Sequence, residues 1–128
     1  MRLEGKSALV TGGAKGIGES IVRLFCQEGA NVLIADMVEE EGTALAAELD
    51  GKGPGRVVFC KTNVTVPAEV EHAVKTAAEA FGGLDILVND AGTVERDTLL
   101  EDMPEEVWFK VLNVNLNGTF LCTKYALP

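Results

Sequence analysis

The chain has 128 residues and a formal net charge of −9, with 47% hydrophobic and 24% charged residues. This size and balance are typical of one soluble α/β domain with a substantial core. The acidic charge argues against nucleic acid as a partner, because contact with a phosphate backbone requires clustered cations. The short apolar runs exclude a membrane-spanning helix, and the charged start does not resemble a secretion signal. We therefore expect a cytoplasmic protein.

The three cysteines and the single histidine show no metal-binding or disulfide pattern. Cys26, Cys60 and Cys122 are widely spaced in apolar stretches, which predicts small core residues in a reducing compartment. His72 stands beside Glu71 in a polar helical stretch and is interpreted as a surface residue. We predict no metal site.

Strands and helices are expected to alternate along the whole chain. Four short apolar runs predict strands, at Ser7–Thr11, Asn31–Ala35, Arg56–Lys61 and Leu84–Asn89. Four longer stretches predict helices, at Gly16–Glu28, Glu39–Asp50, Pro67–Phe81 and Pro104–Ala126. This order predicts an α/β fold, a Rossmann-like doubly wound parallel sheet of about four strands in the order 3-2-1-4. Residues 1–128 are expected to form one dinucleotide-binding domain, incomplete at its C-terminus.

A glycine-rich turn follows the first predicted strand. Gly12 permits a tight turn, Gly16 leaves the backbone open to a ligand, and Gly18 lets the following helix pack close to the strand. The amides of the first helical turn lie at the positive end of the helix dipole, an arrangement that binds a pyrophosphate. The expected cofactor-binding residues of this turn are Gly12, Ala14, Lys15, Gly16, Ile17 and Gly18. An ordinary turn is the alternative.

Asp36 ends the second predicted strand, with Met37 following it. A carboxylate roughly 20 residues beyond the glycine-rich turn is placed to bind the adenosine ribose hydroxyls. It would repel a 2′-phosphate, which favours NAD over NADP, whereas Lys15 could attract that phosphate. An N-cap for the helix that follows is an equally reasonable role for the Asp36 side chain.

Four ordered motifs resemble the classical short-chain dehydrogenase/reductase family from about Leu3 to the last residue. They are Thr11–Gly18, Asn63-Val64-Thr65, Asn89-Asp90-Ala91-Gly92, and Trp108…Asn113-Val114-Asn115-Leu116…Gly118-Thr119-Phe120. The resemblance implies an NAD(P)-dependent enzyme that moves hydride between the nicotinamide and a small secondary alcohol or ketone. The stretch Ala91–Trp108 is similar to 3-oxoacyl-carrier-protein reductases, so 3-oxoacyl thioesters are the alternative substrate class.

The resemblance also implies roles for individual residues. The Asn63 amide oxygen would accept from the adenine amino group, with the Val64 backbone completing the contact; a helix-capping turn is compatible with this role. Ala91 and Gly92 would leave the backbone open beside the ribose, and Asn89 would tie neighbouring strands together. Asp90 stands where the family usually has Asn and adds a negative charge near the cofactor. We therefore expect only the Asp90 backbone, and not its side chain, to contact the cofactor.

Asn115 is the one position that resembles a catalytic residue of the family. There the asparagine distorts its helix and holds a water that relays protons to the catalytic lysine. An asparagine in an apolar helix is a poor helix former whose amide needs a partner. Its neighbours Asn113 and Asn117 are expected to point elsewhere.

The family's catalytic serine and Tyr-x-x-x-Lys pattern are not present in this sequence. Its single tyrosine, Tyr125, follows Lys124 directly, and the two side chains diverge by about 100° on a helix. We therefore expect the chain to be the inactive cofactor half of such an enzyme, with an unpaired edge on its fourth strand. The alternatives are a non-catalytic dinucleotide-binding module and an interaction partner of a full-length relative.

The last predicted helix has a wide apolar arc. Val107, Val111, Val114 and Leu121 form one stripe, and Trp108 and Leu112 lie with Asn115 on a neighbouring face. Relatives bury this helix against its copy, so a homo-oligomer through this helix is expected. The alternative is that the domain's own core absorbs both faces.

Overall fold

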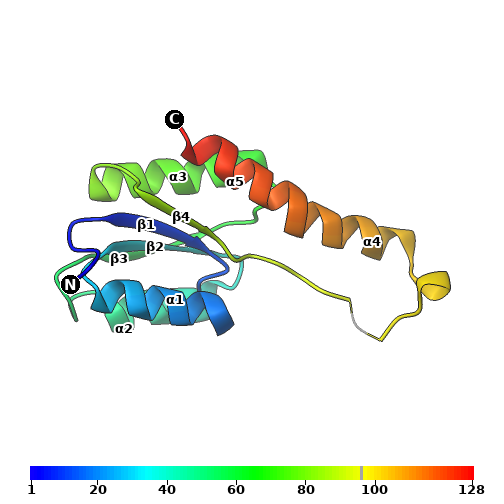
Figure 1. Cartoon of the computed structure of the whole chain (residues 1–128), viewed down its shortest axis with the longest axis horizontal. Coiled ribbons are helices and arrows are strands. Elements are labelled where there is room, and N and C mark those ends of the chain that lie inside the picture. Colours follow the sequence, from blue (N-terminus) through cyan, green and yellow to red (C-terminus); the bar gives the residue numbers. More distant parts are fainter. Residues whose placement is uncertain (96) are drawn as a thin grey trace.

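The computed structural model describes residues 1–95 and 97–128, and it contains a parallel sheet between two layers of helices (Figure 1). The strands are β1 (Ser7–Thr11), β2 (Asn31–Asp36), β3 (Val57–Lys61) and β4 (Ile86–Asn89). They pair in the order β3-β2-β1-β4, with Leu9 of β1 opposite both Leu33 and Leu87. The predicted strand order 3-2-1-4 is confirmed, and β4 lies at an edge of the sheet.

Helices cover both faces of the sheet (Figure 1). On one face lie α1 (Gly16–Gln27) and α2 (Glu39–Leu49), and on the other lie α3 (Pro67–Phe81) and α5 (Gly118–Ala126). A 3-10 turn η1 (Leu100–Asp102), helix α4 (Glu105–Leu112) and a π-helix η2 (Asn113–Asn117) precede α5. Within the described ranges, no helix has the length and apolar character required to cross a membrane.

Two predicted elements differ from the structure by more than a one-residue shift at an end. Strand β4 begins at Ile86 rather than Leu84, because Asp85 exchanges two 2.9 Å hydrogen bonds with the Ser7 backbone before the strand starts. The helix predicted over Pro104–Ala126 starts at Glu105 and is not uniform, since its Asn113–Asn117 segment is a π-helix. Side chains before and after this segment therefore do not follow one α-helical periodicity.

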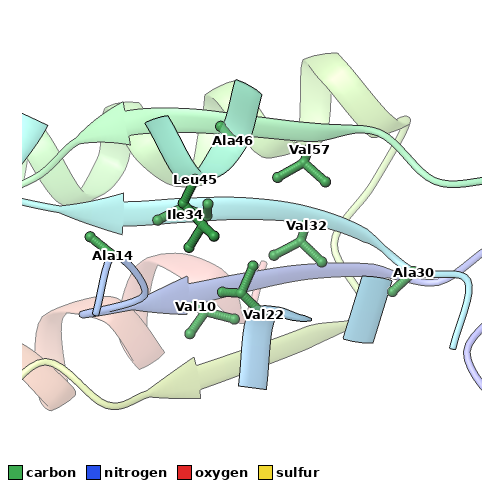
Figure 2. Close-up of a cluster of buried hydrophobic side chains, with 9 residues drawn as sticks. All are labelled: Val10, Ala14, Val22, Ala30, Val32, Ile34, Leu45, Ala46 and Val57. Carbon is green, nitrogen blue, oxygen red and sulfur yellow. The ribbon is translucent and has the colours of Figure 1, made fainter. Parts of the chain in front are cut away.

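Alternating residues of the strands fill two separate apolar layers. On the α1 and α2 side, Val22 lies by Val10 and Leu45 lies by Ile34, all almost inaccessible to solvent (Figure 2). On the opposite side, Leu9 and other strand residues pack against Ala73 and Ala77 of α3. A third cluster around Val64, Val70 and Cys122 joins α3 to α5. Apolar side chains on both faces are the reason for the continuous apolar strand runs.

Backbone segments lie very close together at the turn from β1 into α1. Gly12 has a φ of +65°, and a Cβ at Gly12 would lie 2.9 Å from the Ala91 Cα. A Cβ at Gly18 would overlap the Gly12 carbonyl oxygen and lie 2.9 Å from Asp90 Oδ2. The start of α1 therefore packs directly on the end of β1, which requires glycine at both positions.

The close packing at Gly18 predicts the effect of adding one methyl group. Gly18→Ala should lower the free energy of unfolding by about 1–3 kcal/mol in urea denaturation, because the clashing Gly12 oxygen belongs to the backbone. Gly83→Ala is the matched control, since its Cβ would meet nothing within 4 Å. It should change stability by less than about 0.5 kcal/mol. Unchanged stability of Gly18→Ala would contradict the packing described.

Candidate functional site

A cleft of about 460 Å³ lies where the carboxyl ends of the four strands meet. Its walls are formed by Gly12, Lys15, Ala35, Asp36, Met37, Val38, Thr62, Asn63, Val64, Asp90, Ala91, Gly92, Thr93, Lys110 and Val114. In the sheet, β1 pairs with β2 on one side and with β4 on the other, so successive crossovers leave in opposite directions here. Ligands of open parallel sheets bind at such a switch point.

Four predicted binding residues lie in the turn beside the cleft rather than in its wall. Ala14 is buried, and its N–H donates to Asp36 Oδ2 at 3.0 Å. Gly16 has a φ of +63° with open space where a Cβ would stand, as expected for a backbone open to a ligand. Ile17 is 72% exposed, and Gly18 is buried at the start of α1. Together they place the unpaired amides of the first helical turn at the cleft's edge.

The Asp36 carboxylate is fixed by backbone donors. Its Oδ2 accepts from Ala14 and its Oδ1 accepts from the Val38 N–H, each at 3.0 Å. Helix α2 begins at Glu39 after Val38 and has no side-chain capping bond, so the N-cap role considered for Asp36 is wrong. An ionised carboxylate has about four acceptor sites, so two accepted bonds leave capacity for ligand hydroxyls.

Asn63 forms a turn before α3 that its own side chain stabilises. Its Oδ1 accepts from the Thr65 N–H at 3.0 Å and from the Thr65 hydroxyl at 2.7 Å, and the Asn63 N–H donates to Glu69 Oε1. The predicted turn before Pro67 is therefore present, but Val66 is the N-cap of α3 and the helix has no side-chain capping bond, so Asn63 does not cap it. The bonds from Thr65 occupy both lone pairs of the oxygen that was expected to accept from adenine, so this arrangement leaves only the amide nitrogen of Asn63 for a ligand. Val64 is buried, with its methyl group against Gly118.

Thr11 holds the Asp90-Ala91 segment in place, a role that the sequence interpretation missed. Its hydroxyl oxygen accepts from the N–H groups of Asp90 and Ala91, at 3.1 and 3.0 Å, and donates to the Val88 carbonyl. Asn89 was expected to tie neighbouring strands together, but its amide donates to Thr123 on α5. The expectation for Asn89 is wrong because the last strand residue points toward the helix layer, whereas Thr11 spans β1 and β4.

Asn115 lies in the π-helical segment, so the expected distortion of its helix is present. Its Oδ1 accepts from the Thr93 N–H at 2.7 Å, and its Nδ2 donates to the Thr93 carbonyl at 2.8 Å. The side-chain amide thus bonds to both the N–H and the carbonyl of Thr93, as a neighbouring strand would, and positions the segment after Gly92. Asn117 and Asn113 hydrogen-bond to each other instead, at 3.1 Å.

Several wall residues were not singled out from the sequence. They are Ala35, Val38, Thr62, Thr93, Lys110 and Val114. Lys110 and Val114 stand four residues apart, which is the spacing of one helix face. Val114 also directly precedes Asn115, and this position could have indicated from the sequence that it lies near the site. Tyr125 is partly buried on the cluster of Val70 and Cys122, away from the cleft wall. Among the described residues, no group of three His, Cys, Asp or Glu side chains forms a metal site.

Comparison with known proteins identifies the family of the chain. The model of the short chain dehydrogenase family matches residues 6–128. The 3-oxoacyl-[acyl-carrier-protein] reductase FabG of Thermotoga maritima is 44% identical over 128 residues, which is 100% of this chain and 51% of the relative. The 3-alpha-(or 20-beta)-hydroxysteroid dehydrogenase of Mycobacterium tuberculosis is 48% identical over 120 residues, 94% of this chain and 44% of the relative.

A third relative is the zerumbone synthase of Zingiber zerumbet, which is 45% identical over 127 residues, 98% of this chain and 47% of the relative. The chain therefore spans about half the length of these curated relatives. The family model covers nearly all of the chain, including the glycine-rich turn and the cleft. The chain belongs to the short-chain dehydrogenase family.

Proposed function

We propose that the chain forms the cofactor-binding part of an NAD-dependent oxidoreductase. The bound cofactor would carry hydride to or from a carbonyl carbon. The observation that carries the proposal is the Asp36 carboxylate, fixed at the wall of a cleft that the glycine-rich turn borders. These residues fit a dinucleotide: Asp36 offers acceptors to ribose hydroxyls, and α1 offers unpaired amides to a pyrophosphate.

The substrate class is proposed as a secondary alcohol or ketone. A hydroxysteroid dehydrogenase among the relatives supports this choice, and a 3-oxoacyl reductase supports a 3-oxoacyl thioester as the second candidate. In this reaction Asn115 is proposed to position the neighbouring backbone and not to hold a water with its side chain, because that side chain is already hydrogen-bonded to Thr93. A water for proton relay would then be held by a backbone carbonyl of the π-helical segment, where the normal hydrogen-bond ladder is interrupted.

The proposed preference for NAD predicts the effect of removing the Asp36 carboxylate. Asp36→Ala should weaken NAD binding about 5–150-fold, the equivalent of about 1–3 kcal/mol, through lost ribose hydrogen bonds. The same change should favour NADP relative to NAD by removing repulsion of the 2′-phosphate. Calorimetric titration with both cofactors measures the two effects.

Asp36→Asn is the control for this experiment, because it removes the charge with little change of shape and keeps one oxygen, which can accept from either the Ala14 or the Val38 N–H. It should also shift preference toward NADP, with a smaller loss of NAD affinity than the alanine variant. Tighter binding of NADP than NAD by the unmodified chain would overturn the assignment and indicate that Lys15 dominates.

The polypeptide of residues 1–128 is predicted to be inactive on its own. In the family that the chain belongs to, the expected proton donor to the substrate oxygen is a tyrosine hydroxyl with a lysine four residues later. The Lys124 ammonium instead lies 5.5 Å from the Tyr125 ring centroid. Incubation with NAD and secondary alcohols should form no NADH above the buffer rate. Turnover that is lost in Asn115→Ala would contradict this prediction.

An exposed apolar face is proposed as a homo-oligomer surface. It consists of Phe109 and Leu112 of α4, Leu116 of η2 and Phe120 of α5, with exposures between 39% and 66%. Leu116 and Phe120 line one open hollow on this surface. Apolar side chains gathered on one face of a helix favour association. The stripe of Val107, Val111, Val114 and Leu121 is less exposed. Val114 and Leu121 of this stripe pack on the cluster that joins α3 to α5.

Light scattering at micromolar concentration is predicted to show dimers or larger assemblies. Leu116→Glu should shift the chain toward monomer, because it places a charge in the apolar face. Leu24→Glu is the matched control, since Leu24 is 54% exposed on α1 and lies outside this face. A stable monomer that binds no apolar dye would reject the proposed surface, as would equal effects of the two substitutions.

A further inference from the structure

A second carboxylate, that of Asp90, lies beside the amino end of α1. Its Oδ2 is 2.9 Å from the position that a Cβ would take on Gly18, the third residue of the helix. The carboxylate is held in this place because the backbone N–H of Asp90 donates to the Thr11 hydroxyl at 3.1 Å. Asp90 also forms part of the cleft wall, so its charge is presented where a ligand would bind.

No opposite charge balances this carboxylate within the described part of the chain. Lys15 and Lys110 share the cleft wall with Asp90, but neither approaches its oxygens within 4.0 Å. Among the described residues, the attraction left for it is that of the positive end of the α1 dipole. That same end is the position proposed for the cofactor's pyrophosphate, which carries two negative charges and no hydrogen-bond donor.

We propose that the Asp90 carboxylate competes with the cofactor's pyrophosphate for the amino end of α1 and thereby lowers the affinity for phosphate-bearing ligands. The inference rests on the proposed function, because it concerns the same cleft. Asp90 is then a specificity-determining residue: it discriminates against charge at the pyrophosphate position and leaves binding of an uncharged nucleoside unaffected. Like charges in a partly shielded cleft repel over several ångströms, and added salt screens the repulsion.

Asp90→Asn tests the proposal with almost no change of shape, and the backbone bond to Thr11 is retained. Titrations followed by amide chemical shifts should show NAD binding about 3–30-fold tighter in this variant, equivalent to about 0.7–2 kcal/mol. Adenosine, which has no phosphate, should bind both proteins equally. The gain for NAD should shrink as salt is raised. Glu79→Gln, an exposed charge change on α3, should alter neither affinity.

The possible outcomes separate the two proposals. Equal NAD affinities in the unmodified protein and Asp90→Asn would overturn this inference while leaving the proposed function intact. Tighter binding of adenosine by Asp90→Asn would also overturn it, because the effect would then not depend on phosphate. Failure of all folded variants to bind NAD would instead overturn the proposed function, and this inference with it.

Discussion

The structure depends on how closely three backbone segments approach one another at the carboxyl end of β1. Gly12 and Gly18 have no side chains to separate the strand, the helix and Ala91. The Thr11 hydroxyl fixes this arrangement by bonding two N–H groups of the segment that follows β4. One side of the cleft is therefore largely backbone held by the Thr11 hydroxyl, and the glycines leave backbone donors open to a ligand.

Features governed by local pattern could be predicted from the sequence. The apolar runs around Leu9 and Leu33 identify strands buried on both faces, and the glycine spacing identifies a strand–turn–helix unit. Asp36 could be placed at the cleft because the carboxyl ends of parallel strands meet at one edge of the sheet. These inferences need only the period of the pattern and the direction of the chain, which a sequence contains.

The partners of individual polar side chains could not be predicted in this way. Thr11 bonds to residues 79 and 80 positions away, and Asn115 bonds to a residue 22 positions away. The sequence does not indicate which of many distant residues will provide the hydrogen-bond partner of a given polar group. Asn89 and Thr11 both stand at strand ends with suitable groups, and only the three-dimensional arrangement decides that Thr11 joins the strands. The π-helical segment likewise cannot be recognised from apolar spacing alone.

Asp36 ends β2 and Asp90 follows β4, the two strands that flank β1. Their different surroundings give the two negative charges opposite effects. The Asp36 carboxylate receives two backbone N–H bonds and still has acceptor capacity, so ribose hydroxyls can donate to it. A pyrophosphate has no donor to offer Asp90, so there the charge produces only repulsion. A carboxylate in this cleft therefore helps or hinders binding according to whether the facing part of the ligand carries hydrogen-bond donors. Net charge of the cleft alone does not determine its affinity for a dinucleotide.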